Sequence, residues 1–235
     1  MRERIKDAMV LAAGRGTRMR SLTNETPKPM IRVCGKPLID YVFDHLHAQG
    51  VSHIVVNLCY LGEMIRAHCL TRTDARFDFS TEEDALETGG GVKKALPLLN
   101  APYFFVSNSD PLWTNGKERA LDRMEKAWNP DTMDALLLLV PKDRAYGHDG
   151  TGDYFVVDGK PVRKQNPQDE APYIFAGVQI LKTSLFDDSP DGKFRLVPLY
   201  DKAQAAERLA CVVHDGEWFH VGTPEALQSA QEKLS

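Results

Sequence analysis

Two glycines and four basic side chains lie close together between residues 11 and 29. Gly14 and Gly16 follow the apolar run 8–13, which predicts a buried strand that ends in a loop. The cations of this loop are Arg15, Arg18, Arg20 and Lys28. Glycines let backbone N–H groups approach an anion closely, and cations neutralise charge that amides alone cannot. The segment therefore predicts a phosphate-binding loop.

The loop lacks the patterns of the two best-known glycine-rich phosphate sites. A dinucleotide fingerprint would need a third glycine where Met19 stands, and a Walker A loop would need Gly-Lys-Ser/Thr, which the chain does not contain. Two glycines alone also suit an ordinary strand-to-helix turn. The prediction of a binding loop therefore depends on the four cations, in a chain of formal net charge −4.

A second glycine-rich stretch occupies residues 82–91. Gly89, Gly90 and Gly91 would let a flat base or ribose lie against bare backbone. Thr88 is placed to cap the helix predicted after it. The alternative is that the glycines only form a turn.

A carboxylate follows another predicted strand, at residues 103–106. Asp110 stands just beyond the end of this strand, in the sequence Ser107-Asn108-Ser109-Asp110. Magnesium takes hard oxygen ligands, and usually only one or two carboxylates beside phosphate oxygens, so Asp110 is a candidate metal ligand. The alternative is an aspartate that caps the next turn.

Strand and helix patterns alternate along the first 140 residues. This order predicts an α/β fold: a single-domain, mixed and mostly parallel Rossmann-like sheet flanked by helices. We expect one domain over residues 1–235, because chains of this length commonly form a single α/β domain. The phosphate loop and Asp110 would then share the carboxyl edge of the sheet, where open α/β sheets bind ligands.

Short local signals predict where elements begin and end. Gly50 would stop a helix, Asp158-Gly159 would form a tight hairpin turn, and Pro198 would interrupt a helical stretch. Thr223 would cap the terminal helix. The expected helices include 37–49, 61–70, 115–128 and 224–234.

The glycine loop also resembles that of a known family. Residues Ala13–Met19, followed by Thr26–Met30, resemble the loop of the sugar-1-phosphate nucleotidyltransferases. The resemblance covers nearly the whole chain and implies the nucleotidyltransferase (GT-A-like) fold. It also implies that the loop wraps the triphosphate of a nucleotide. The implied nucleotide-binding residues are Ala13, Gly14, Gly16 and Thr17, with Arg18 and Lys28 as catalytic residues at the reacting phosphates.

The same resemblance assigns roles at the other two segments. It implies that Glu82, Gly89 and Gly90 bind the nucleotide at its base. The run 86–91 is most similar to that of N-acetylmuramate-1-phosphate uridylyltransferases, although guanylyl-transferring relatives also have glycine and acidic residues here. Asp110 would act in catalysis as a metal ligand. Asn108 and Gly177 would contact the sugar.

Two positions depart from the family pattern. Relatives often have Glu-Lys-Pro, whose lysine contacts the sugar phosphate, where this chain has Gln165-Asn166-Pro167, and Lys164 is an open substitute. His220 stands where the family has a second metal-binding aspartate. If His220 is a ligand, imidazole would favour Mn²⁺ or Co²⁺ over Mg²⁺. The alternative is that His220 does not touch the metal.

The resemblance implies a specific reaction. A nucleotidyl group would pass from a nucleoside triphosphate, with UTP expected, to a sugar 1-phosphate, with N-acetylmuramate 1-phosphate expected. The products would be an NDP-sugar and pyrophosphate, and the reaction would belong to peptidoglycan recycling. A phosphate monoester is mostly dianionic at pH 7, so no general base is required. One alternative is an enzyme similar to mannose-1-phosphate guanylyltransferases. The other is a non-catalytic sugar-nucleotide sensor, which the changes at Asn166 and His220 suggest.

Composition and charge limit the class of protein, its location and its partners. With 43% hydrophobic and 26% charged residues, the chain has the composition of a globular protein. It has no apolar run of membrane length and no leader pattern, so we expect a cytoplasmic protein. The net charge gives no general attraction for nucleic acid. We expect small-molecule substrates only, no nucleic acid or membrane partner, four reduced cysteines, and a monomer or homodimer.

Overall fold

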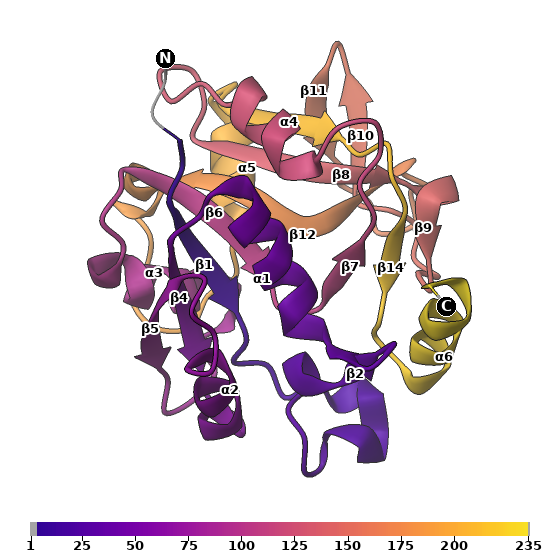
Figure 1. Ribbon diagram of the computed structural model, residues 1–235. Helices are drawn as coiled ribbons and strands as arrows, with labels where there is room; N and C mark the ends of the chain where they lie inside the picture. Colours follow the sequence, from indigo (N-terminus) through magenta and orange to yellow (C-terminus); the bar gives the residue numbers. More distant parts are fainter. Residues whose placement is uncertain (1–3, 235) are drawn as a thin grey trace.

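Four parallel strands form the half of the main sheet that begins with the predicted phosphate-loop strand. In the computed structural model, which describes residues 4–234, they lie in the order β6-β1-β4-β5 (Figure 1). They are β1 (Asp7–Leu11), β4 (His53–Leu58), β5 (Arg76–Thr81) and β6 (Tyr103–Asn108). Their carboxyl ends share one edge, as predicted. The two ends of the predicted 1–235 domain lie outside the described residues.

The other half of the sheet is mostly antiparallel. The strands are β8 (Ala135–Pro141), β10 (Tyr154–Val157), β11 (Lys160–Arg163), β12 (Tyr173–Lys182) and β13 (Leu209–Val213). Strand β12 runs antiparallel to both β6 and β8, which makes one mixed sheet of nine strands. Asp158 and Gly159 join β10 to β11 with φ angles of 50° and 77°, so the predicted tight hairpin is confirmed.

Helices cover both faces of this sheet, so the predicted single-domain α/β architecture is confirmed. They are α1 (Leu38–Gln49), α2 (Gly62–Cys69), α3 (Glu87–Ala95), α4 (Ala120–Ala127), α5 (Val197–Ala205) and α6 (Pro224–Leu234). Alternate residues of β1 face opposite sides, as a pleated strand requires. Ala8 and Val10 pack into the core with α1, α2 and α4, whereas Met9 packs into the core with α3 and α5.

A small second sheet extends the edge near Asp110. It consists of β7 (Pro111–Trp113), β14 (Trp218–His220) and β9 (Ala145–Tyr146), and α6 packs against it (Figure 1). The remaining elements are the hairpin β2 (Arg32–Val33) and β3 (Lys36–Pro37), and the 3₁₀ turns η1 (Thr17–Thr23), η2 (Lys28–Met30), η3 (Leu96–Leu98), η4 (Lys142–Arg144) and η5 (Thr183–Phe186). The register pairs His220 with Pro111, which follows Asp110 directly.

Two of the predicted helix boundaries are confirmed and two others are wrong. Gly50 ends α1 with φ of 94°, and the Thr223 hydroxyl accepts from the N–H of Ala226 (3.2 Å). The predicted helix 115–128 begins only at Ala120. Asn115 lies before the helix, and its Oδ1 accepts from the N–H of Ala120, the first helical residue (3.0 Å). Pro198 lies in the first turn of α5, so it starts this helix instead of interrupting it.

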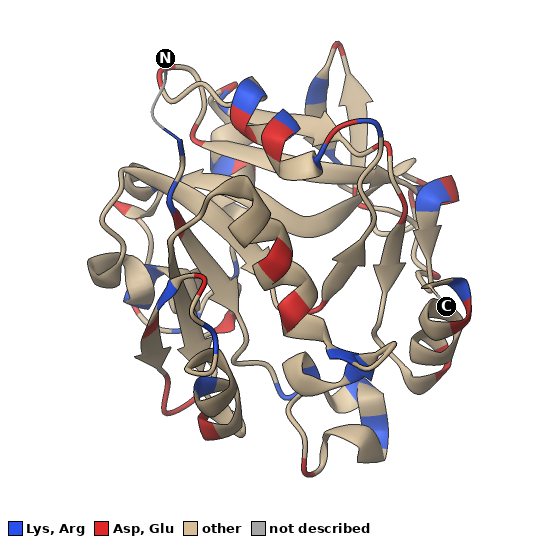
Figure 2. Ribbon diagram, viewed as in Figure 1, with Lys and Arg blue, Asp and Glu red and all other residues tan. Residues whose placement is uncertain are grey.

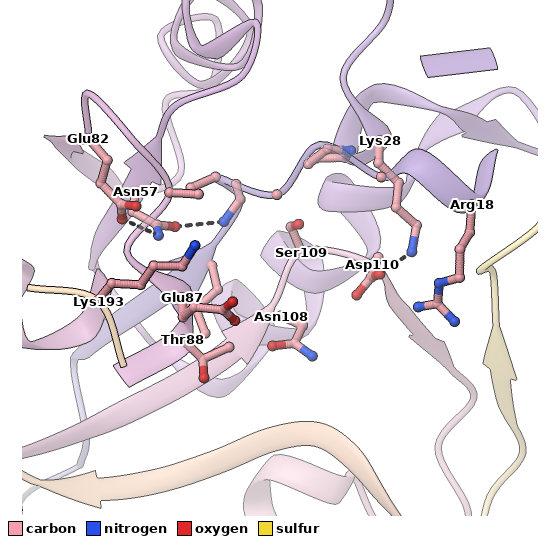
Figure 3. A pocket seen from close by; sticks show the side chains of 17 residues that line it. Arg18, Lys28, Asn57, Glu82, Glu87, Thr88, Asn108, Ser109, Asp110 and Lys193 are labelled. Atoms are coloured by element: carbon pink, nitrogen blue, oxygen red, sulfur yellow. Dashed lines mark hydrogen bonds and ion pairs between the residues drawn. The ribbon is translucent and has the colours of Figure 1, made fainter. Parts of the chain in front are cut away.

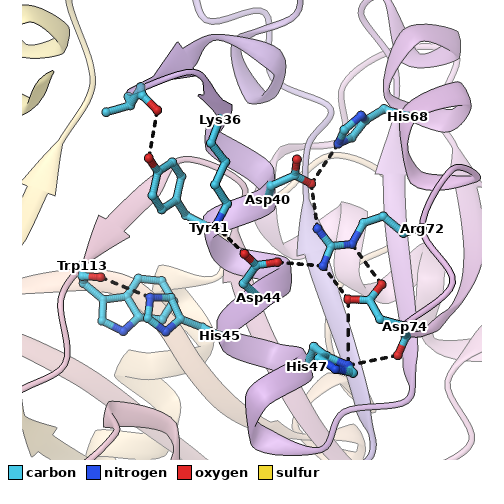
Figure 4. A network of polar contacts seen from close by, with 11 residues as sticks. Lys36, Asp40, Tyr41, Asp44, His45, His47, His68, Arg72, Asp74 and Trp113 are labelled. Carbon is cyan, nitrogen blue, oxygen red and sulfur yellow. Dashed lines mark hydrogen bonds and ion pairs between the residues drawn. The ribbon is translucent and has the colours of Figure 1, made fainter. Parts of the chain in front are cut away.

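A network of charged side chains joins α1 to the segment after α2 (Figure 4). Arg72 donates to Asp40 (3.0 Å), Asp44 (2.8 Å) and Asp74 (3.0 Å). The hydrogen bond from Arg72 is the main reason that the pKa of Asp74 lies below its ordinary value. On the same helix, His45 contacts the Trp113 carbonyl and His47 contacts the Asp74 carbonyl, so the two imidazoles point to different sides.

Acidic and basic residues are interspersed over the elements seen in Figure 2. None of the four cysteines forms a disulfide bond. Within residues 4–234, no helix combines the length and the apolar character needed to cross a membrane.

Candidate active site

The loop after β1 is folded around Gly16. Its φ of 63° lies in the left-handed region, and a Cβ there would stand 2.7 Å from Lys28 Cβ, so both conformation and packing require glycine. The Gly16 carbonyl accepts from the Met19 N–H (2.9 Å) and the Thr23 hydroxyl (3.2 Å). At Gly14, by contrast, a Cβ would meet nothing within 4 Å. Gly14 therefore borders open space, as a loop that admits a ligand requires.

The four cations of the loop separate into two pairs. Arg18 and Lys28 line a cavity beside the loop. The Arg15 guanidinium lies over the ring of Tyr60 (5.5 Å), and Arg20 pairs with Glu225 (3.1 Å) at the surface. Only two of the four predicted cations are therefore placed to contact a ligand in this cavity.

The cavity measures about 420 Å³ and contains most of the candidate residues (Figure 3). It lies at the carboxyl ends of β1, β4 and β6, as the sequence predicts. The candidate residues in its wall are Ala13, Gly14, Gly16, Arg18, Lys28, Glu82, Asn108 and Asp110. Thr17, Gly89, Gly90, Gly177 and His220 do not belong to this wall.

A buried polar relay connects the phosphate loop to the second glycine-rich stretch. Asn57, at the end of β4, accepts from the Ala12 N–H through Oδ1 (2.7 Å) and donates through Nδ2 to Glu82 Oε1 (2.7 Å). Glu82 Oε2 accepts from the Leu86 N–H (2.8 Å). Asn57 is 2% exposed and Glu82 is 3% exposed. Both oxygens of Glu82 therefore already hold protein groups, so its expected contact with a base stays a prediction.

Gly89 and Gly90 lie beneath another part of the chain. A Cβ at Gly89 would stand 2.4 Å from the ring of Phe194, and one at Gly90 would stand 2.1 Å from the carbonyl oxygen of Gly192. The N–H groups of both glycines donate to the Phe194 carbonyl (2.9 and 3.0 Å). The expectation that a base or ribose lies against their bare backbone is therefore wrong, because the chain itself covers it.

Thr88 also differs from its predicted place. Helix α3 begins at Glu87, so Thr88 and the three glycines form its first turns and Thr88 is not the cap. The Thr88 hydroxyl instead accepts from the N–H of Leu196 (3.0 Å). Glu87 and Thr88 both line the cavity.

Lys28 and Asp110 form an ion pair at the far end of the cavity (Figure 3). Lys28 comes from η2 and Asp110 from the turn after β6, and their side chains are only 11% and 28% exposed. The Ser109 N–H donates to the Leu11 carbonyl (3.1 Å), which fixes this turn against the end of β1. The pair brings a donor for phosphate and a hard oxygen ligand to one place.

A second hollow of about 200 Å³ adjoins this end of the cavity. Arg18, Asn108 and Asp110 line both spaces, and His220 and Gly177 line the second. Gly177 has φ of 77°, and a Cβ there would stand 2.7 Å from Asn108 Nδ2, so glycine is needed to admit the asparagine. The structure thus brings together the two residues predicted to contact a sugar.

His220 is held neutral at pH 7. Its pKa is lowered to about 4, mainly by burial and also by the nearby Lys28 and Arg18 charges. The His220 ring lies so close to Gly222 that a Cβ added there would stand 2.3 Å from Nε2. The centroids of the His220 and His148 rings are 5.8 Å apart. A neutral imidazole is chemically able to bind a metal.

Comparison with known proteins identifies the family. A family model described as nucleotidyl transferase matches residues 7–235. The chain belongs to this family. It is 41% identical over 235 residues to N-acetylmuramate alpha-1-phosphate uridylyltransferase of Caulobacter vibrioides, covering 98% of this chain and 97% of that protein. The enzyme of the same description from Neisseria meningitidis is 35% identical, with 95% and 96% covered.

Solved structures show the same fold. HddC from Yersinia pseudotuberculosis, complexed with GMP-PN, superimposes with a TM-score of 0.76 at 24% sequence identity, covering 98% of this chain and all of that one. The predicted nucleotidyltransferase fold is therefore confirmed.

This nucleotidyltransferase offers few protein ligands for a metal. Among residues 4–234, no three His, Cys, Asp or Glu side chains are grouped so that they could hold an ion. Asp110 nevertheless fits a cation that takes most of its ligands from phosphate oxygens and water. His220 adds a nitrogen beside the same hollow, and its coordination of a metal stays a prediction.

Asn166 stands at the position where the resemblance led us to expect a lysine. Asn166 lies in a turn, where its carbonyl accepts from the Asp169 N–H (3.0 Å), and it lines neither space described above. Lys164 donates to the Thr151 hydroxyl and to the carbonyls of Pro167 and Asp169 (3.3 and 3.4 Å). Lys164 thus holds its own loop together, and its role as a substitute for the family lysine stays open.

Residues of the site that were not among the sequence-based candidates include Asn57, Glu87, His148 and Lys193. Asn57 is a polar residue near the end of an apolar strand, which is a signal that could have been used. His148 and Lys193 stand in loops, and no local pattern marks them.

Proposed function

We propose that this nucleotidyltransferase transfers the uridylyl group of UTP to N-acetylmuramate 1-phosphate and releases pyrophosphate. The observation that carries the proposal is the cavity that unites the loop of Gly14 and Gly16 with Lys28 and Asp110 at one end and Glu82 at the other. A nucleoside triphosphate needs such a space, with phosphate-binding groups along one part and a base site further along. The names of the two relatives at 41% and 35% identity support uridine and N-acetylmuramate.

The residues divide the chemistry between them. The sugar-phosphate oxygen, already deprotonated near pH 7, attacks the α-phosphorus in line with departing pyrophosphate. The backbone at Ala13, Gly14 and Gly16 and the exposed Thr17 surround the triphosphate. Arg18 neutralises charge that develops on pyrophosphate, and Lys28 bridges the two reacting phosphates. Catalysis then depends on alignment and charge, without a general base.

A divalent cation at Asp110 is part of the proposal. It would neutralise charge on the phosphates and fix their geometry. Mg²⁺ is the expected ion, with Mn²⁺ or Co²⁺ favoured if His220 also binds it. Until substrate arrives, Lys28 neutralises the Asp110 carboxylate.

The hollow beside Asp110 is proposed as the sugar site. Asn108 and Gly177 line it from β6 and β12, which are neighbours in the sheet. A sugar phosphate held there would place its phosphate next to Arg18 and Asp110, since both residues line the two spaces. We propose a cytoplasmic role in the recycling of cell-wall sugars, on small-molecule substrates only. The expected monomer or homodimer stays a prediction.

Competition among nucleotides tests the proposal. UTP, GTP, dTTP and CTP are mixed at equal, limiting concentrations with N-acetylmuramate 1-phosphate, and the products are separated by chromatography. UTP should be consumed first. A tenfold or greater preference for GTP would instead indicate an enzyme similar to mannose-1-phosphate guanylyltransferases. Binding of nucleotide without pyrophosphate release, with any metal or sugar phosphate, would favour a sensor.

A further inference from the structure

One cation at the base end of the cavity has no part in the chemistry described above. Lys193 lines the cavity together with Glu82 and Glu87, and its side chain extends into the space between them (Figure 3). Within residues 4–234, no hydrogen bond or ion pair to its ammonium is found. The neighbouring cations of this region, Lys93 and Arg195, are both paired with carboxylates.

The backbone on both sides of Lys193 is fixed against α3. The Phe194 carbonyl accepts from the Gly89 and Gly90 N–H groups (2.9 and 3.0 Å), and the Phe194 N–H donates to the Leu86 carbonyl (3.1 Å). Before Lys193, the segment is held by Lys93, which pairs with Asp191 (2.8 Å). We call residues 191–196 the strap. The strap keeps the ammonium at the base end and away from Arg18, Lys28 and Asp110, which lie at the other end (Figure 3).

The groups around Lys193 define what it can recognise. Glu87 presents a carboxylate to the same part of the cavity, whereas both oxygens of Glu82 already accept hydrogen bonds from the protein. Glu87 also pairs through Oε2 with Arg195 Nε (3.6 Å). The groups left for a ligand are therefore one donor, the Lys193 ammonium, and one acceptor, Glu87 Oε1. A base that carries a carbonyl oxygen next to a ring N–H matches this pair. Uracil does so with O4 and N3–H.

We propose that Lys193 is a specificity residue that selects a keto base, uracil in this enzyme, by donating to its carbonyl oxygen. The inference rests on the proposed function and adds a role for the strap. Cytosine has the shape of uracil but carries an amino group in place of O4 and lacks the N3 proton. The amino group of cytosine would face the Lys193 ammonium, which places two donors together. Its unprotonated N3 would face the Glu87 carboxylate, which places two acceptors together. The pair also rejects adenine, and it does not separate uracil from guanine.

The test compares UTP with CTP in the full chain. Lys193→Met keeps the length and apolar stem of the side chain but removes the charge and the donors. Loss of a hydrogen bond from a charged group should lower the UTP/CTP ratio of kcat/KM by about 10- to 100-fold. Lys193→Arg should retain most of the preference. Lys94→Met is the matched control, because Lys94 donates to the Thr81 carbonyl (2.6 Å) outside the cavity wall and should leave the ratio unchanged.

Equilibrium binding separates this inference from the proposed function. Calorimetric titration of UTP and CTP without sugar phosphate should show the same loss of preference in Lys193→Met, even if no turnover is detected with N-acetylmuramate 1-phosphate. An equal loss for both nucleotides, or a rise in KM for the sugar phosphate alone, would place the ammonium on a phosphate and overturn the inference. An unchanged UTP/CTP ratio would also overturn it, leaving Lys193 as a solvated surface residue.

Discussion

Gly90→Ala should destabilise the protein although it places a better helix former in a helix. Alanine improves helix propensity over glycine by about 1 kcal/mol. The new Cβ, however, would stand 2.1 Å from the Gly192 carbonyl oxygen and 3.0 Å from Leu86 Cβ. Because the first of these atoms belongs to backbone, it cannot move without moving the strap.

The size of the effect follows from the contacts that the strap would lose. Three backbone hydrogen bonds join Phe194 to Gly89, Gly90 and Leu86. At about 1 kcal/mol each, their loss removes about 3 kcal/mol. Subtracting the gain in propensity leaves a net fall of about 2 kcal/mol in the free energy of unfolding. For a domain of this size, Tm should fall by about 4–8 °C.

Urea unfolding and calorimetry measure this change, and Gly14→Ala provides the control. A Cβ at Gly14 meets nothing within 4 Å, so Gly14→Ala should leave stability nearly unchanged while impairing nucleotide binding. Amide hydrogen exchange should accelerate at Phe194 in Gly90→Ala. A Tm that stays the same or rises in Gly90→Ala would refute the view that Gly90 is required for packing under the strap.

Three further results are expected. Arg18→Ala should lower kcat by about 10²- to 10³-fold, while Arg15→Ala, whose guanidinium lies over Tyr60, should change it little in steady-state assays. If His220 is a metal ligand, wild type should be more active with Mn²⁺ or Co²⁺ than with Mg²⁺, and His220→Asp should restore turnover with Mg²⁺; identical metal titrations would remove His220 from the metal site. Burial lowers the pKa of His45 from 6.5 to about 4, so the unfolded chain binds more protons in this window and stability should fall as pH falls. In urea titrations from pH 7 to 4.5, His45→Gln should weaken this dependence.

The sequence predicted most of what local patterns determine. Alternating apolar runs identified the strands around the site, and Gly50, Asp158-Gly159 and Thr223 marked turns and caps correctly, because their conformations depend on near neighbours. The placement of Gly16, Lys28 and Asp110 at one edge also followed, since parallel strands direct their carboxyl ends to the same side.

The errors at the candidate site concern contacts between distant parts of the chain. Gly89 and Gly90 looked available to a ligand, because nothing near them in sequence announces that residues 192–194 cover them. Thr88 had the side chain of a cap, yet its hydroxyl bonds to Leu196, 108 residues away. These contacts depend on the path by which residues 192–196 return to the sheet. No periodicity in the sequence encodes that path.

The relay through Asn57 has a consequence for changing base preference. Its hydrogen bonds connect Ala12, Asn57 and Glu82, which belong to three separate stretches of the chain. Transplanting the 82–91 stretch from a relative with another base preference would therefore also shift the amide of Ala12 at the phosphate loop. The base site and the phosphate site that we propose are therefore coupled, and residue 57 should be exchanged together with any graft that replaces Glu82.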